Sequence, residues 1–272
     1  MCFHFYLSLS YALFYKFITF YVDQLSHMSN FRVIKLNAIP STNDYLKKRY
    51  KSGKLLDGDL VWTENQTSGR GQHNKKWISE PFKSLTLSIY RQFNGLLIKP
   101  FKLNAVVCLG IIYALKKLSI PGLSIKWPND ILSENKKIGG ILIENFFYKS
   151  KIKASIIGVG LNLNQDKFEK LPKATSLKIV TGEKWASKII LDALIPVLEE
   201  YLFIFDFHDS SILDQYESIL WRRNKTVFFD MDGKLHKRKL KGVDESGMII
   251  LQDQKQMISK FDNSQISIQY GD

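Results

Sequence analysis

A short polar segment with two glycines around an arginine has the residue types that hold an anionic ligand. Residues 66–77 read Gln-Thr-Ser-Gly-Arg-Gly-Gln-His-Asn-Lys-Lys-Trp. Gly69 and Gly71 let the backbone adopt conformations that other residues avoid and approach a ligand closely. Between them, Arg70 offers a planar fork of N–H donors that suits phosphate or carboxylate. The segment predicts an anion-binding loop, although a plain surface turn has the same composition.

A second polar group, later in the chain, carries lysines in a stiffer setting. Residues 126–130 read Lys-Trp-Pro-Asn-Asp and end a short apolar run. The proline restricts the turn and would fix the direction of Lys126. Lys137 follows, just before the pair Gly139-Gly140. A lysine at the end of a strand is most often solvated, but a flexible arginine loop beside a rigid lysine turn can hold an anionic substrate against a nucleotide phosphate.

Four sequence blocks together resemble the biotin protein ligase family, and they occur in the family's order. They are Ser41-Thr42-Asn43-Asp44, the Gly-Arg-Gly loop up to Trp77, residues 126–144 and residues 158–164. Each block alone is weak evidence, but four in order are specific, and the resemblance runs from about residue 31 to the C-terminus. It implies an α+β fold with a mixed β-sheet flanked by helices, similar to class II aminoacyl-tRNA synthetases and lipoate ligases. A small SH3-like β-barrel is implied at the C-terminus.

The resemblance also implies roles for individual residues. The residues expected to hold biotin are Ser41, Thr42, Asn43, Gln66, Arg70, Gly71, Gln72, Lys137, Gly139 and Gly140. Those expected to hold ATP are Arg70, Lys126, Asn129 and Asn162, and the catalytic cations are Arg70, Lys126 and Lys137. Asp130 is expected to help hold Mg²⁺, which keeps few protein ligands. Gln72 stands where some members have a second arginine, so this loop carries one charge fewer.

Taken without the resemblance, some of these residues have simpler interpretations. Ser41 and its neighbours indicate a helix N-cap. The pair Gly139-Gly140 is equally typical of a bulge in a strand. These structural roles are compatible with binding roles, because a cap also fixes the loop that presents its side chains.

The implied activity is that of an ATP-dependent biotin–protein ligase. Biotin and ATP would form biotinyl-5′-AMP, and a lysine of a biotin carrier domain, such as that of acetyl-CoA carboxylase, would then take the biotin. No general base is expected, because positioning and electrostatics can carry both steps. The alternatives are a lipoate–protein ligase or octanoyltransferase on the same fold and, less favoured, a non-catalytic biotin-sensing protein.

Composition sets the remaining limits. The 272 residues suffice for one large domain and a small one, and 45% hydrophobic with 24% charged residues is ordinary for a soluble protein. Two distant cysteines, Cys2 and Cys108, argue against a disulfide framework and fit a cytoplasmic location. The net charge of +13 indicates either a solvated basic surface or steering of an acidic carrier. Residues suited to such steering are Arg222, Arg223, Lys237, Arg238 and Lys239.

No basic helix-turn-helix pattern precedes the motifs, so specific DNA binding is not expected. The identity of the carrier and the oligomeric state, monomer or homodimer, stay open.

The elements that must position these residues follow from the hydrophobic pattern. Strands are predicted at 31–37, 59–64, 84–90, 123–126, 138–146 and 152–161, and helices at 44–48, 103–118, 186–206 and 210–220. After Trp221, short β-like runs are predicted at 226–229, 240–243, 248–251 and 265–268. The expected division is an N-terminal extension at 1–28, a catalytic domain at 29–220 and an SH3-like domain at 221–272.

The first 22 residues are strongly aromatic and apolar, but Lys16 interrupts them. They lack a basic start and a small-residue cleavage site, so they make a poor secretory signal. We favour an upstream extension before a start at Met28. The alternatives are a membrane anchor, in which Lys16 would be costly, and a soluble helix.

Overall fold

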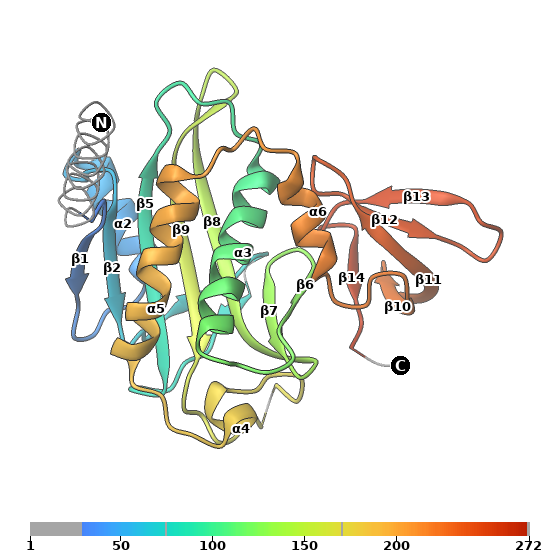
Figure 1. Ribbon diagram of the computed structural model, residues 1–272, viewed down its shortest axis with the longest axis horizontal. Helices are drawn as coiled ribbons and strands as arrows, with labels where there is room; N and C mark the ends of the chain where they lie inside the picture. Colours follow the sequence, from blue (N-terminus) through green and yellow to red (C-terminus); the bar gives the residue numbers. More distant parts are fainter. Residues whose placement is uncertain (1–28, 74, 170, 271–272) are drawn as a thin grey trace, which may run out of the picture.

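The computed structural model describes residues 29–73, 75–169 and 171–270 (Figure 1). The expectations for residues 1–28 lie outside the described residues. In the described ranges, no helix is both long and apolar enough to cross a membrane.

The larger sheet is mixed, with seven strands in the order β1-β2-β5-β9-β8-β7-β6. Its strands are β1 (Arg32–Lys35), β2 (Asp59–Thr63), β5 (Ser84–Gln92), β6 (Ser124–Lys126), β7 (Asp130–Ser133), β8 (Lys136–Tyr148) and β9 (Lys151–Asn162). The pair β1–β2 is parallel, and the other neighbours are antiparallel. A short hairpin, β3 (Gly69–Arg70) with β4 (Lys76–Trp77), stands apart from this sheet.

Helices cover both faces of the larger sheet. One face carries α3 (Pro100–Lys117), α5 (Ser187–Glu199) and α6 (Ser211–Ser218), which lie in front of the sheet in Figure 1. The opposite face carries α2 (Thr42–Lys51) over a smaller apolar cluster that includes Leu46 and Val61. Strand β5 is buried on both faces, and because successive side chains point to opposite faces, its leucine and isoleucine side chains share one face and its hydroxyl side chains share the other.

The chain after α6 forms a second sheet, which is antiparallel. Its order is β13-β12-β11-β10-β14, with bounds β10 (Thr226–Met231), β11 (Lys234–Val243), β12 (Ile249–Gln252), β13 (Ile258–Phe261) and β14 (Ile266–Ile268). This arrangement is consistent with the expected small SH3-like domain. Its apolar residues, such as Phe229 and Leu251, join the same buried cluster as the larger sheet. The small sheet therefore packs beside α6 and the edge strand β6 (Figure 1).

The structure differs from the pattern-based prediction at several elements. Strands β7 and β13 were not predicted, because β7 begins inside the polar motif at 126–130 and β13 is exposed along most of its length. The predicted helix at 186–206 is α5 followed by a π-helical turn, η1 (Glu200–Ile204), with Pro196 inside α5. A further helix, α4 (Leu177–Thr181), was also missed.

Candidate functional site

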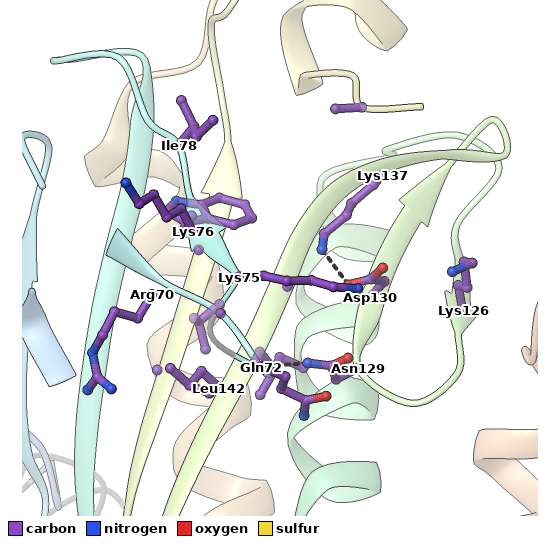
Figure 2. Close-up of a pocket in the computed structure, with 18 of the residues that line it drawn as sticks. Arg70, Gln72, Lys75, Lys76, Ile78, Lys126, Asn129, Asp130, Lys137 and Leu142 are labelled. Carbon is purple, nitrogen blue, oxygen red and sulfur yellow. Dashed lines mark hydrogen bonds and ion pairs between the residues drawn. The ribbon is translucent and has the colours of Figure 1, made fainter. Parts of the chain in front are cut away.

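A cavity of about 480 Å³ lies between the β3–β4 hairpin, the strands β6 to β9 and the end of the small sheet (Figure 2). Every residue that the sequence predicts for the site lines this cavity, except Gly139. Those that line it are Ser41, Thr42, Asn43, Gln66, Arg70, Gly71, Gln72, Lys126, Asn129, Asp130, Lys137, Gly140 and Asn162. The fold thus brings together four blocks that are far apart in the chain.

The two adjacent glycines of β8 have different surroundings. A Cβ on Gly139 would lie 2.5 Å from Leu161 Cδ2 and 2.8 Å from the Gly160 carbonyl oxygen. Gly139 therefore permits β8 to pack against β9, as in the strand-bulge interpretation, and it does not line the cavity. A Cβ on Gly140 would lie 3.3 Å from Lys137 Nζ, inside the cavity.

One end of the cavity is a buried network of neutral polar groups at the start of α2. The Ser41 hydroxyl caps the helix by accepting from the Asp44 backbone N–H at 3.2 Å, as predicted. The Thr42 backbone N–H donates to Gln66 Oε1 at 2.9 Å. The buried Ser88 hydroxyl on β5 lies 2.7 Å from Thr42 Oγ1 and 2.6 Å from Asn43 Oδ1. Ser88 was not predicted from the sequence. The one indication was its place among the hydroxyl side chains that alternate with apolar residues in β5.

The Asn43 side chain in this network is held in a fixed orientation. Its Nδ2 donates to Glu144 Oε2 at 3.1 Å and to the Leu142 carbonyl at 3.3 Å. On its other side, a Cβ added to Gly158 would lie 2.3 Å from Asn43 Oδ1. The glycine at 158 is therefore needed for Asn43 to occupy this position.

Arg70 extends from the hairpin to two carboxylates that the sequence did not identify as partners. Its Nη2 lies 2.5 Å from Asp44 Oδ1 and 3.3 Å from Glu144 Oε2. Glu144 also pairs with Lys47 at 2.6 Å. In Figure 2 Arg70 lies on the opposite side of the cavity from Lys126. The hairpin is therefore fastened to α2 and β8 through this one guanidinium.

Glu144 makes this end of the site sensitive to acid. Burial raises its pKa, but hydrogen bonds from Lys47 and Asn43 and the charge of Arg70 outweigh burial, so the net shift is downward. Its stabilising contribution is therefore present above the ordinary glutamate pKa of about 4.3 and is lost as pH falls through the lower folded-state value.

We expect Glu144→Gln to remove this part of the pH dependence. Thermal unfolding between pH 3 and pH 6 should show a smaller loss of Tm on acidification in the variant than in the unchanged chain. Glu200→Gln, on η1 and outside the cavity, is the control. An equal decrease of Tm with falling pH in all three proteins would contradict the prediction.

The other end of the cavity carries cations. Lys137 Nζ pairs with Asp130 Oδ1 at 2.5 Å (Figure 2). Lys126 is 9% exposed, and within the described residues its ammonium makes no hydrogen bond or ion pair. Burial lowers the pKa of Lys126, the Asp130 carboxylate opposes this, and nearby Lys137 and Lys75 lower it further. Lys75 and Lys173 also line the cavity, and sequence reasoning missed both.

Contacts from distant elements hold the turn that follows Lys126. The Pro128 carbonyl accepts from Asn104 Nδ2 at 2.8 Å and from the buried Tyr216 hydroxyl at 2.9 Å. Trp127 Nε1 donates to the Gly247 carbonyl of the small sheet at 2.9 Å. These contacts tie the segment that carries Lys126 to α3, to α6 and to the small sheet, as a rigid turn would require.

The donor set for a metal is small. The described residues contain no group of three or more His, Cys, Asp or Glu that could hold an ion. Asp130 is the one carboxylate among the described residues that line the cavity. A single carboxylate suits Mg²⁺ carried largely by substrate phosphates and water, so the role of Asp130 stays a prediction.

The cavity wall near β9 was only partly predicted. The Asn162 side chain is buried and donates from Nδ2 to the Thr175 carbonyl at 3.0 Å. The Trp77 ring lies against Gly160, where a Cβ would come within 2.6 Å of it. The indole N–H of Trp77 is buried and has no hydrogen-bond partner among the described residues. Trp77 ended a motif in the sequence but was given no role.

Comparisons with known proteins agree with this geometry. Residues 36–162 match the model of the Biotin/lipoate A/B protein ligase family. A biotin protein ligase from Aquifex aeolicus, solved in complex with biotin and ATP, has a TM-score of 0.73 and 26% identity, covering 88% of this chain and 98% of that one. A Helicobacter pylori biotin acetyl coenzyme A carboxylase synthetase has a TM-score of 0.58 at 25% identity, covering 84% and 99%.

Curated relatives are similar over a shorter stretch. A Mycobacterium tuberculosis biotin--[acetyl-CoA-carboxylase] ligase is 33% identical over 50% of this chain and 51% of its own length. A bifunctional ligase/repressor of Salmonella typhimurium is 32% identical over 53% of this chain and 44% of its own length. The chain thus spans about half the length of the curated relatives it matches.

Proposed function

Because residues 36–162 match the model of the Biotin/lipoate A/B protein ligase family, we propose that the chain is a biotin–protein ligase. Biotin and ATP give biotinyl-5′-AMP and pyrophosphate. The ε-amine of a lysine on a biotin carrier domain then attacks the mixed anhydride and releases AMP. One observation carries the proposal: a single cavity is lined both by neutral hydrogen-bonding groups, such as Asn43, and by the cations Arg70, Lys126 and Lys137.

The neutral end suits the ureido head of biotin. A urea presents both donors and acceptors, and hydroxyl and amide side chains supply both in return. Thr42, Asn43 and Gln66 are already held there by hydrogen bonds with one another and with Ser88, and the Ser41 hydroxyl is held by the Asp44 backbone N–H. Because the network is preformed, little side-chain conformational entropy is lost when the head group binds.

The cationic end suits the reacting carboxylate and phosphate. Attack of one anion on another requires positive charge placed between them. Lys126 and Lys137 approach from β6 and β8, and Asn129 and Asn162 lie nearby as hydrogen-bonding side chains. We propose that Arg70 exchanges Asp44 and Glu144 for the anionic groups of the ligand. The hairpin with Gly71 and Gln72 then covers the reactive anhydride and excludes water.

Asp130 would help to hold Mg²⁺, and the ion would supply positive charge that offsets the charge of the phosphates. The transfer step needs a neutral lysine on the partner and an activated leaving group. We assign no general base, because the anhydride is already reactive and positioning supplies the rate.

The proposed partner is a biotin carrier domain, and the proposed location is the cytoplasm. The basic residues Arg222, Arg223, Lys237, Arg238 and Lys239 are candidates for steering an acidic carrier. We also retain the division into a catalytic domain at 29–220 and a C-terminal domain at 221–272, because a separate sheet begins after α6.

The test is transfer of labelled biotin to a purified carrier domain with and without ATP and Mg²⁺. We expect ATP-dependent label that falls by roughly tenfold or more in Arg70→Ala, since one charge-assisted contact to the adenylate is lost. Arg49→Ala is the matched control, because Arg49 is on the same helix as Asp44 but outside the cavity.

The alternatives give different results. Incorporation of lipoate or octanoate in place of biotin would identify the chain as a lipoate–protein ligase or an octanoyltransferase. Biotin binding without pyrophosphate release would indicate a non-catalytic sensor.

A further inference from the structure

An aromatic ring from the end of the small sheet reaches the cationic end of the cavity. Tyr270, two residues after β14, lines the cavity together with Lys126. The Lys126 ammonium lies 4.5 Å from the centroid of the Tyr270 ring. A cation within about 6 Å of the face of an aromatic ring is attracted by the negative charge of that face.

The position of Tyr270 is determined by contacts on both sides. The backbone N–H of Gln269 donates to the Phe228 carbonyl at 2.9 Å, which ties the segment to β10. The Tyr270 ring lies 5.4 Å from the Trp221 ring. Trp221 in turn donates from its backbone N–H to the Ile125 carbonyl at 2.8 Å, directly beside Lys126. The ring and the lysine are therefore held by one connected set of elements.

The same segment reaches the cavity at a second point. Asn263, in the turn between β13 and β14, donates from Nδ2 to Gln72 Oε1 of the hairpin at 3.1 Å. Ile266 and Ile268 line the cavity between these two contacts. The end of the small sheet is thus a wall of the site.

Lys126 differs from the other predicted cations in what surrounds its charge. Lys137 has a carboxylate partner in Asp130, and Arg70 has two, whereas Lys126 has the face of Tyr270. A carboxylate neutralises a lysine and competes with an incoming phosphate. An aromatic face stabilises the buried ammonium without neutralising it, so the full charge stays available to an anion.

We propose that Tyr270 is a positioning residue, whose ring face holds the Lys126 ammonium toward the nucleotide phosphate and so sets the affinity of the site for ATP. The inference deepens the proposed ligase function and rests on it. The ring is the active part, because the Tyr270 hydroxyl makes no hydrogen bond with a described residue. Tyr270→Phe should therefore preserve the affinity for ATP, whereas Tyr270→Leu should lower it.

The first experiment needs no ligand. In the full chain labelled with ¹³C-lysine, the Lys126 ε-CH₂ protons should show an upfield ring-current shift, with the resonance assigned by its loss in Lys126→Met. The shift should persist in Tyr270→Phe and disappear in Tyr270→Leu. A Lys126 resonance at the ordinary lysine position in the unchanged chain would overturn the proposal.

The second experiment separates the two substrates. Pyrophosphate release should show a KM for ATP raised about fivefold in Tyr270→Leu, as expected for loss of one cation–aromatic contact, with the KM for biotin unchanged. Tyr270→Phe should restore the KM for ATP. Tyr148→Leu is the matched control, because the Lys149 ammonium lies 5.5 Å from the Tyr148 ring on an exposed hairpin outside the cavity.

The outcomes distinguish this inference from the proposed function. If both KM values rise together in Tyr270→Leu, or if phenylalanine fails to rescue, the ring is only part of the wall and the proposal is wrong. If the unchanged chain shows the ring-current shift but releases no pyrophosphate with biotin and ATP, the Lys126–Tyr270 contact stands and the ligase function fails.

Discussion

Lys126→Met should lower the rate of biotin-dependent pyrophosphate release by about a hundredfold or more, the loss typical when one preorganised stabilising group is removed from an active site. Lys126 is buried in the cavity, and its ammonium pairs with no described carboxylate. No described carboxylate therefore neutralises its charge, and in the proposed function this charge is available to a phosphate. Methionine keeps most of the side-chain volume, so the change removes charge with little loss of packing.

Lys136→Met is the control for this prediction. Lys136 lies at the start of β8 and is exposed, outside the cavity, next to the cavity lysine Lys137. The control should keep its activity within about twofold, because an exposed charge is screened by solvent. If Lys126→Met releases pyrophosphate at an undiminished rate, the Lys126 charge does not contribute to the reaction. The proposed phosphate role would then be wrong.

Gly158→Ala should weaken biotin binding by roughly a hundredfold, because two buried hydrogen-bonded contacts are disturbed together. The added Cβ would lie 2.3 Å from Asn43 Oδ1, so Asn43 must move. Its contacts with Ser88 and Glu144 would then break, and these contacts fix the neutral end of the cavity. The measurement is the dissociation constant for biotin by equilibrium dialysis.

A second glycine substitution separates this local effect from a general loss of stability. Gly110→Ala in α3 places a Cβ 3.1 Å from Leu198 Cδ2, in the core and away from the cavity. Overpacking of this kind costs about 1–3 kcal/mol of stability, but biotin affinity should not change. If Gly158→Ala is folded and binds biotin as tightly as the unchanged chain, Asn43 does not contribute to the biotin site.

Local patterns in the sequence determined much of the fold and most members of the site. The alternation in β5, the apolar spacing of α3 and the Ser41 cap each depend on neighbouring residues, so their elements could be predicted. The four motifs identified the cavity residues because they belong to a recurrent pattern. The proline after Lys126 also predicted a restricted turn, although the contacts that hold this turn come from distant elements.

Tertiary structure alone decided which of these residues act together. Gly139 and Gly140 are identical in type, and only the pairing of β8 with β9 and β7 places one against a strand and the other in the cavity. A shift of one residue along a strand reverses the face of every side chain, and the sequence does not show that register.

Contacts between residues far apart in the chain cannot be predicted from local sequence patterns either, because they depend on how the elements pack. Asp44 and Glu144 meet Arg70 only because α2 packs across the sheet beside the hairpin. Tyr270 meets Lys126 only because the small sheet shares a core with the large one. The sequence by itself indicated which residues would carry the proposed chemistry. Packing between distant elements decided which charges are neutralised, which stay available to a ligand, and which ring holds the lysine in place.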